Sequence, residues 1–260
     1  MNIAEFVESL TTSGRYHFTS NEAVKALNIS IVAARAAIRR LQKKGAIAIP
    51  HHGFYVMVPP EYRHLGCLPP EQFIPHLMEH LGLDYYVSLL SAAEFHGAAH
   101  QRPQVFQVVA ALNRPRIRCG QVRIQFVARH NVSEIPTLTK NTPRGYVLVS
   151  SAEATAFDLV GYARCCGGFD NVTTVLMELA ESLKGEELAG IASLSPVPWA
   201  QRLGYLLEMA GAHALTEPLA EHVANVARDY VPLNPKQGQK GHTRSSRWKL
   251  VINAKVESDL

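Results

Sequence analysis

The chain has 260 residues, of which 47% are hydrophobic and 18% are charged. This composition can bury a substantial core and excludes a disordered protein. No apolar run reaches about eighteen residues, and no charged-then-apolar segment opens the chain, so we expect a cytoplasmic protein that does not contact membranes. The four cysteines, Cys67, Cys119, Cys165 and Cys166, lack the paired spacing of a zinc site and are interpreted as reduced thiols.

The formal net charge of +4 is unevenly distributed. Residues 1–60 carry seven basic and three acidic side chains, residues 61–230 carry thirteen and seventeen, and residues 231–260 carry six and two. Both ends are therefore basic, while the middle is acidic. Because phosphate binding depends on local clusters of cations, this asymmetry favours contact with nucleic acid at one end or at both.

The first sixty residues predict two short capped helices, a basic third helix and a hairpin. Thr19 and Glu22 have the spacing of a capping box, so a helix is expected to begin near Ser20. It should end near Asn28, a residue type that tolerates the left-handed conformation. Over residues 31–44, apolar residues recur at three- and four-residue steps, which indicates a helix with one buried stripe. The members of this stripe are Ile31, Ala34, Ile38 and Leu41.

A second stripe of this helix is cationic. Arg35, Arg39 and Lys43 follow each other at i, i+4 spacing with no acidic residue between them, which is repulsive in an isolated helix and favours a polyanionic partner. A solvated charged face is the alternative. However, a capped helix precedes the basic one across a short turn, as in a helix-turn-helix whose second helix enters the major groove of DNA. The predicted DNA contacts on this helix are Arg35, Arg39, Arg40, Lys43 and Lys44, the last three mainly to the DNA backbone.

A hairpin is expected to follow Gly45. Two β-prone runs, residues 46–49 and 54–58, flank a turn sequence at residues 50–53, which predicts the wing of a winged helix-turn-helix. His51 and His52 lie at its tip, where they could donate to phosphates or reach a minor groove. Two histidines on a turn can also be merely exposed.

Two proline pairs, at residues 59–60 and 69–70, interrupt both ladders and helices. We therefore predict a winged helix-turn-helix domain at residues 1–60, a linker at 61–70 and a larger domain at 71–260. The expected fold class is α+β, with a small sheet and several helices in the larger domain. Predicted helices cover 70–81, 85–96, 151–162, 171–183, 186–194 and 198–210, and predicted strands cover 105–109, 120–128, 146–149 and 248–252, with a turn at 113–116.

Two of the later helices have predicted starts. Ser150 and Glu153 have capping-box spacing, and Asp170 is expected to cap the helix that follows it.

The C-terminal part of the larger domain contains a basic segment at residues 236–249. Residues 234–242 have the polar, glycine-containing composition of a mobile loop. Such a segment could bind phosphate or an acidic protein surface, and a solvated loop is the alternative. Its cations are Lys236, Lys240, Arg244, Arg247 and Lys249.

A search for chemistry finds no motif of a metalloprotease, a serine hydrolase or a phosphate-binding loop. His96 and His100 lie four residues apart, but Gly97 intervenes and no carboxylate has metal-binding spacing, so both are interpreted as structural. Asp158 and Asp170 are the candidates for Mg²⁺ binding in a nuclease, and nothing in the sequence clusters them. We predict no catalytic residue, no metal and no cofactor.

Several blocks of the sequence carry a family resemblance. They lie at residues 85–101, 103–109, 142–143, 149–160, 167–172 and 201–208 and include Gly167-Gly168-Phe169-Asp170-Asn171-Val172. Together they resemble the AbiEi antitoxins of bacterial type IV toxin–antitoxin, or abortive-infection, systems. The resemblance implies a winged helix that represses its own operon by binding inverted repeats in the promoter. It also implies a C-terminal domain that counters a nucleotidyltransferase-like toxin without forming a stable complex with it.

Two hypotheses follow from the sequence. The first is a DNA-binding autorepressor with antitoxin activity, acting on double-stranded DNA and opposing a cognate toxin. The alternative is a DNA-acting enzyme, such as a nuclease, that is targeted by its winged helix. The oligomeric state stays open, because inverted repeats suit cooperative monomers as well as a stable dimer.

Overall fold

The computed structural model of the protein describes residues 1–98 and 103–256. It confirms the α+β class. The chain divides into two compact units, of which the first contains residues 1–86, 104–132 and 139–148 and the second contains 87–103, 133–138 and 149–260. The predicted linker at 61–70 lies inside the first unit. That residues 1–60 form a separate domain stays a prediction. In the part of the chain that the structure describes, we found no helix with the length and apolarity needed to cross a membrane.

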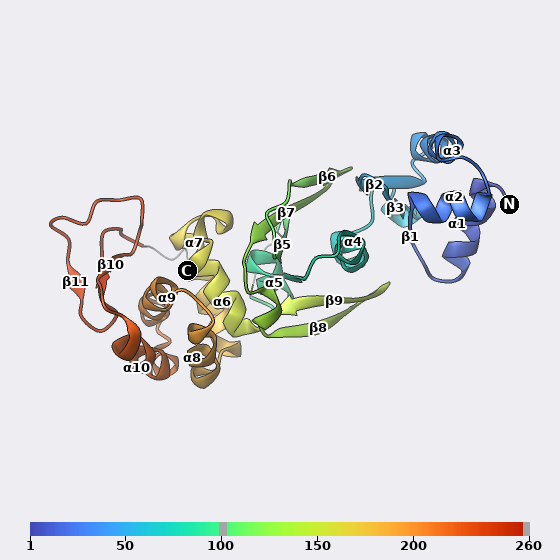
Figure 1. Cartoon of the computed structure of the whole chain (residues 1–260). Coiled ribbons are helices and arrows are strands. Elements are labelled where there is room, and N and C mark those ends of the chain that lie inside the picture. Colours follow the sequence, from blue (N-terminus) through green and yellow to red (C-terminus); the bar gives the residue numbers. More distant parts are fainter. Residues whose placement is uncertain (99–102, 257–260) are drawn as a thin grey trace. The chain divides into compact units, whose positions relative to one another are not determined.

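The N-terminal elements follow the predicted order of three helices and a hairpin (Figure 1). Thr19 caps α2 and forms the expected capping box with Glu22, and Asn28 ends this helix in the left-handed conformation, with φ of 52°. The hairpin turn is shorter than predicted, because its first strand continues through His51 and leaves only residues 52–53 between the strands. The elements are α1 (Ile3–Thr12), β1 (His17–Thr19), α2 (Ser20–Leu27), α3 (Ile31–Lys43), β2 (Ile47–His51) and β3 (Phe54–Met57).

A small aromatic core holds these elements together. Strand β3 lies between β1 and β2 in an antiparallel sheet. The Phe18 ring on β1 packs 5.4 Å from Phe6 of α1 and 5.1 Å from Tyr55 of β3, measured between ring centroids. Ile38 anchors α3 in the same core. Ile31 was predicted to belong to the buried stripe of α3 but is exposed at the first residue of the helix, and Ala37 is buried instead.

A six-stranded sheet in the order β6-β7-β5-β4-β9-β8 follows two short 3₁₀ turns and α4 (Ile74–Leu81). The predicted helix at 85–96 is wrong in its first residues, because Tyr85–Val87 form strand β4 and the helix α5 covers Leu89–Phe95. The predicted turn at 113–116 does not join β5 directly to β7. These two strands pair in parallel, and a single turn cannot connect parallel neighbours. The unpredicted strand β6 follows the turn and pairs antiparallel with β7. The other strands are β5 (Phe106–Ala110), β6 (Ile117–Cys119), β7 (Val122–Ala128), β8 (Thr137–Thr142) and β9 (Gly145–Ser150).

The second unit is built around one buried helix, α6 (Ala152–Gly161), which contacts α5, α7, α8 and α9. Residues 152–160 of α6 are all buried, including the polar Glu153, Thr155 and Asp158. Two predicted caps are wrong: Ser151 rather than Ser150 caps α6, and Gly168 rather than Asp170 precedes α7. The remaining helices are α7 (Phe169–Leu179), α8 (Gly185–Ser193), α9 (Val197–Met209) and the unpredicted α10 (Glu217–Val226).

The C-terminal segment is fastened to α9 by Trp248. Its indole is fully buried, and Nε1 donates a hydrogen bond of 2.8 Å to Glu208 Oε2. The predicted last strand shortens to β12 (Leu250–Val251), which lies between β10 (Val231–Pro232) and β11 (Arg244–Ser245). The base of the predicted loop at 234–242 is held by the buried Asn253 amide, which donates to the carbonyls of Asn234, Gln237 and Gly238.

Gly204 makes this docking possible, and its replacement tests the arrangement. A Cβ atom at Gly204 of α9 would overlap the Trp248 ring, so we expect Gly204→Ala to destabilise the protein by about 1–3 kcal/mol. The measurement is urea unfolding. Gly190→Ala is the matched control, because Gly190 lies in α8 with no atom near its added Cβ and should stabilise the helix slightly. Equal stability of both variants would contradict the packing described for Trp248.

Candidate nucleic-acid interface

A groove of about 190 Å³ lies between α3 and the β2–β3 hairpin. Helix α3 contributes Arg35, Arg39 and Gln42 to its walls, and the hairpin contributes His52 and Tyr55, together with Gly53 at the turn. The structure therefore brings together three of the predicted contact residues, Arg35, Arg39 and His52. Gln42 and Tyr55 are polar neighbours that the sequence reading did not select.

The positive charge of α3 has no counter-ion among the residues that the structure describes. All five cations predicted to contact DNA, four on α3 and Lys44 at its C-cap, are exposed, and α3 contains no Asp or Glu. Over the residues that the structure describes, none of the five side chains forms an ion pair or a hydrogen bond. Stacked cations repel one another, so a polyanion would relieve a repulsion that the fold leaves in place. The five are Arg35, Arg39, Arg40, Lys43 and Lys44.

The two histidines of the hairpin have different environments. His52 is exposed and lines the groove. His51 is half-buried, its Nδ1 lies 3.0 Å from the His52 carbonyl, and its ring centroid lies 6.3 Å from that of His80 on α4. Burial lowers the pKa of His51, which disfavours the protonated form that would attract phosphate. The structure thus places His52, and not His51, in the groove.

The first turn of α3 exposes an apolar side chain that the sequence reading did not select. Val32 is 73% exposed, the highest exposure among the large hydrophobic residues described. An amphipathic pattern draws attention to the buried stripe and the charges, and it gives no signal for an exposed valine. An apolar group at this position can contact a thymine methyl in a major groove.

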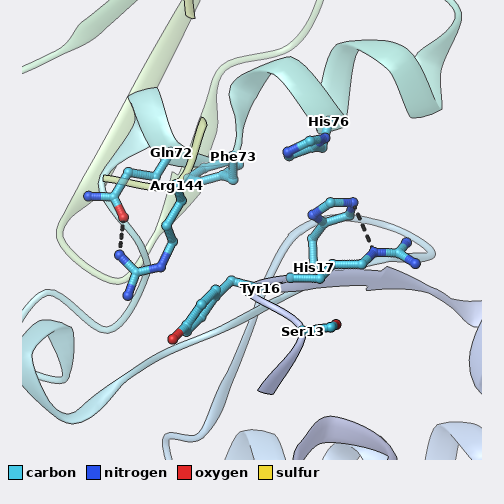
Figure 2. A pocket seen from close by; sticks show the side chains of 9 residues that line it. Ser13, Tyr16, His17, Gln72, Phe73, His76 and Arg144 are labelled. Atoms are coloured by element: carbon cyan, nitrogen blue, oxygen red, sulfur yellow. Dashed lines mark hydrogen bonds between the residues drawn. The ribbon is translucent and has the colours of Figure 1, made fainter. Parts of the chain in front are cut away.

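A second pocket, of about 240 Å³, is organised by Arg144 (Figure 2). The Arg144 guanidinium lies 4.0 Å over the Tyr16 ring and 5.5 Å from the Tyr62 ring. It donates hydrogen bonds to Gln72 Oε1 and to Glu61 Oε1. These contacts neutralise and orient Arg144, so we interpret this pocket as a packing junction of the first unit.

Two histidine rings stack in the same pocket. The ring centroids of His17 and His76 are 4.0 Å apart, and His17 also stacks 5.7 Å from Phe54. Burial, followed by the neighbouring His76 and Arg15, lowers the pKa of His17 to about 4. Burial also lowers the pKa of His76. Both rings are therefore neutral near pH 7, as close stacking requires.

The basic C-terminal residues do not form one free surface. Arg247 is paired with Glu208 at 2.7 Å and with Glu217 at 2.6 Å, and Lys249 Nζ donates to the Ala227 carbonyl at 2.6 Å. These two cations hold the C-terminal segment in place. Arg244 lies 5.2 Å over the Tyr230 ring, and Lys236 and Lys240 are exposed.

A buried polar network links two of the sequence blocks that carry the family resemblance. Ser88 Oγ donates to Asp158 Oδ2 at 2.8 Å, and Ser150 Oγ donates to Ser88 Oγ at 3.2 Å and lies 2.7 Å from Thr155 Oγ1. All four residues are fully buried. The network satisfies polar groups that would otherwise be costly to bury. We therefore interpret these four residues as structural.

The residues considered for metal chemistry are placed apart from any common site. Asp158 is buried in this network, whereas Asp170 is exposed on α7. Nε2 of His96 lies 2.8 Å from the Ser150 carbonyl, and His100 lies outside the described residues. Across residues 1–98 and 103–256, no group of three or more potential metal ligands occurs.

Comparison with known proteins assigns the middle part of the chain to a family. Residues 86–209 match the family model of the AbiEi antitoxin C-terminal domain. This region belongs to the AbiEi antitoxin family. The AbiEi domain includes the buried network and helices α5 to α9, and it supports an antitoxin role with a toxin as the partner.

A wider likeness extends over nearly the whole chain. The crystal structure of the RV2827C protein from Mycobacterium tuberculosis matches it with a TM-score of 0.64 at 16% sequence identity, covering 95% of this chain and 90% of that one. At this identity the likeness shows a shared fold. The comparison with curated proteins found no match.

The stacked histidines predict a loss of stability in mild acid. Because the pKa of His17 is about 4 in the fold and about 6.5 in an unfolded chain, the unfolded state binds more protons between these values. The free energy of unfolding should therefore fall as the pH drops from about 6.5 towards 4. We expect His17→Phe to reduce this fall, measured by urea unfolding at neutral and at acid pH.

The exposed His64 supplies the control for this measurement. His64→Gln should lose stability on acidification as the parent does. An identical acid-induced loss in His17→Phe and in the parent would show that His17 is not held neutral by its neighbours.

Proposed function

We propose that this AbiEi antitoxin is a sequence-specific repressor of its own operon, with residues 1–60 as a winged helix-turn-helix. The observation that carries the proposal is the groove between α3 and the hairpin, which Arg35, Arg39 and His52 line. The cations of α3 have no ion-pair partner among the described residues. Helix α3 follows the capped helix α2 across a three-residue turn, the geometry in which a second helix enters the major groove.

The contacts are divided between bases and backbone. Arg35 and Arg39 line the groove and are the candidates for base edges, with Val32 in the first turn of α3 available to a thymine methyl. Arg40, Lys43 and Lys44 serve the phosphates, which receive most of the hydrogen bonds in such interfaces. The hairpin acts as the wing and brings His52 to the DNA backbone or the minor groove.

The second part of the proposal concerns the toxin. The AbiEi domain at residues 86–209 opposes a nucleotidyltransferase-like toxin, without forming a stable complex with it. The protein acts in the cytoplasm, where its promoter and its toxin are found. In this proposal the protein is not an enzyme. The alternative of a targeted nuclease has little support, because Asp158, one of the two candidate Mg²⁺ ligands, is fully buried and accepts a hydrogen bond from Ser88.

The experiment that tests DNA binding is fluorescence anisotropy with the duplex upstream of the protein's own gene and a scrambled duplex. The parent protein should prefer the upstream duplex. Arg35→Ala/Arg39→Ala should lose at least about tenfold in affinity for it, because each charged contact contributes about 1.5–3 kcal/mol. Circular dichroism should show that this variant stays folded, since both side chains are exposed.

A matched control separates the site from the net charge. Lys184→Ala/Arg228→Ala removes the same charge from exposed positions of the second unit and should bind the upstream duplex as the parent does. Retained binding by Arg35→Ala/Arg39→Ala, or equal losses in the two double variants, would refute α3 as the recognition helix.

The two activities should be separable. With antitoxin and toxin expressed from unrelated promoters, Arg35→Ala/Arg39→Ala should still protect cells from the toxin, because the substituted residues lie outside the AbiEi domain. The measurement is growth after toxin induction, with equal antitoxin levels verified by immunoblot. Loss of protection in the folded variant would mean that neutralisation depends on DNA binding.

A further inference from the structure

A cavity of about 540 Å³ lies in the second unit, within the size range of small-molecule sites. Its walls come from the end of α6, the 3₁₀ turn Ala163–Cys166, the start of α7 and the C-terminal segment. The lining contains four cations but a single carboxylate, that of Asp170, among the described residues. The cations are Arg164, Arg202, Lys236 and Lys255.

The decisive residue in the cavity wall is Arg202 of α9. It is only 9% exposed, and its Nε donates a 3.1 Å hydrogen bond to the Pro232 carbonyl. Within residues 1–98 and 103–256, no carboxylate pairs with Arg202 and its Nη atoms form no hydrogen bond. Burial accounts for the lowered pKa of Arg202. The side chain is largely buried, but its Nη atoms are not sealed from solvent. Since no described carboxylate neutralises the guanidinium, it can bind an anion that enters the cavity.

The start of α7 adds a second attraction for an anion. Gly168 precedes this eleven-residue helix with φ of 100°, and no side chain caps it. The N-terminus of a helix carries partial positive charge and is suited to phosphate. Arg164 and Lys236 are exposed at the cavity, where their side chains can close on a ligand.

The other walls suit an organic group beside the anion. The partly exposed rings of Tyr162 and Phe169 line the cavity together with Val160 and Val256. Tyr162 is braced by an edge contact with Trp199, with ring centroids 5.1 Å apart. An aromatic or sugar moiety can therefore pack against apolar surface while a charged group faces Arg202.

We propose that this cavity binds the phosphate monoester of a small organic molecule. Arg202 is the buried partner of the phosphate, Arg164 and Lys236 contact it from the exposed side, and Tyr162 and Phe169 hold the organic moiety. Two blocks of the family resemblance, residues 167–172 and 201–208, supply part of this lining. The site is independent of the proposed DNA interface, because it lies in the other unit.

The test is isothermal titration calorimetry of the full chain with adenosine 5′-monophosphate, inorganic phosphate and adenosine as probes. The monophosphate should bind with one site per chain, phosphate should compete for it, and adenosine should bind much more weakly. Arg164→Ala/Lys236→Ala should weaken the monophosphate about tenfold or more, because two charge-assisted contacts are lost. Lys184→Ala/Arg228→Ala, which changes no lining residue, should bind it as the parent does.

Each other outcome overturns part or all of the proposal. If neither the monophosphate nor phosphate binds at millimolar concentration, the cavity is not a phosphate site. Equal binding of adenosine and the monophosphate would exclude Arg202 as a phosphate partner. Unchanged binding in Arg164→Ala/Lys236→Ala would place the ligand elsewhere. The same variant should bind the upstream duplex normally, so a failure of this proposal is distinguishable from a failure of the proposed repressor function.

Discussion

The proposed function depends on uncompensated positive charge on one exposed helix face. Arg35, Arg39 and Lys43 follow one another at i, i+4 spacing without an acidic neighbour on α3, and isolated helices of this kind are destabilised by repulsion. Here Ile38 and the rings of Phe18 and Tyr55 supply burial that offsets the repulsion. The core therefore holds the cations in one orientation beside the hairpin, which is what a rigid polyanion such as duplex DNA needs for recognition.

In the second unit, the central helix α6 is buried on every side, so its polar side chains need hydrogen-bond partners inside the protein. Helix α6 carries Thr155 and Asp158 into the interior, and both find partners in Ser88 and Ser150 from distant parts of the chain. The network makes the blocks of the AbiEi domain mutually dependent in packing. Arg202, by contrast, lines a cavity and is paired with no described carboxylate, so it is available to a ligand, whereas the network residues are satisfied by one another.

Local features of the chain could be predicted, because they depend on neighbouring residues. The Thr19 capping box, the end of α2 at Asn28 and most helices were read correctly from spacing alone. Strand β8 was missed because its residues are largely exposed and do not alternate, and β4 was missed because three residues are too few for a period. The predicted cap of α6 is one residue too early, because Ser150 and Glu153 have capping-box spacing, whereas Ser151 caps the helix without a Glu three residues later.

Long-range contacts set the limit for the candidate sites. The sequence identified the cations of α3, and their placement beside His52 required the hairpin geometry. It could not show that Arg247 is neutralised by Glu208 and Glu217, which lie at least thirty residues away. Nor could it show that Arg202 is buried without an acid, because both burial and pairing depend on the packing of α9 against the C-terminal segment.

The most direct measurement of the central claim is the salt dependence of binding to the upstream duplex. If the five cations of α3 bind phosphates and bases, the logarithm of the association constant should fall linearly with the logarithm of salt concentration. The slope should be about −3 to −5, since each neutralised phosphate contributes about −0.9. A slope near zero, or equal slopes and affinities for the upstream and scrambled duplexes, would contradict the account of α3 as a sequence-reading helix.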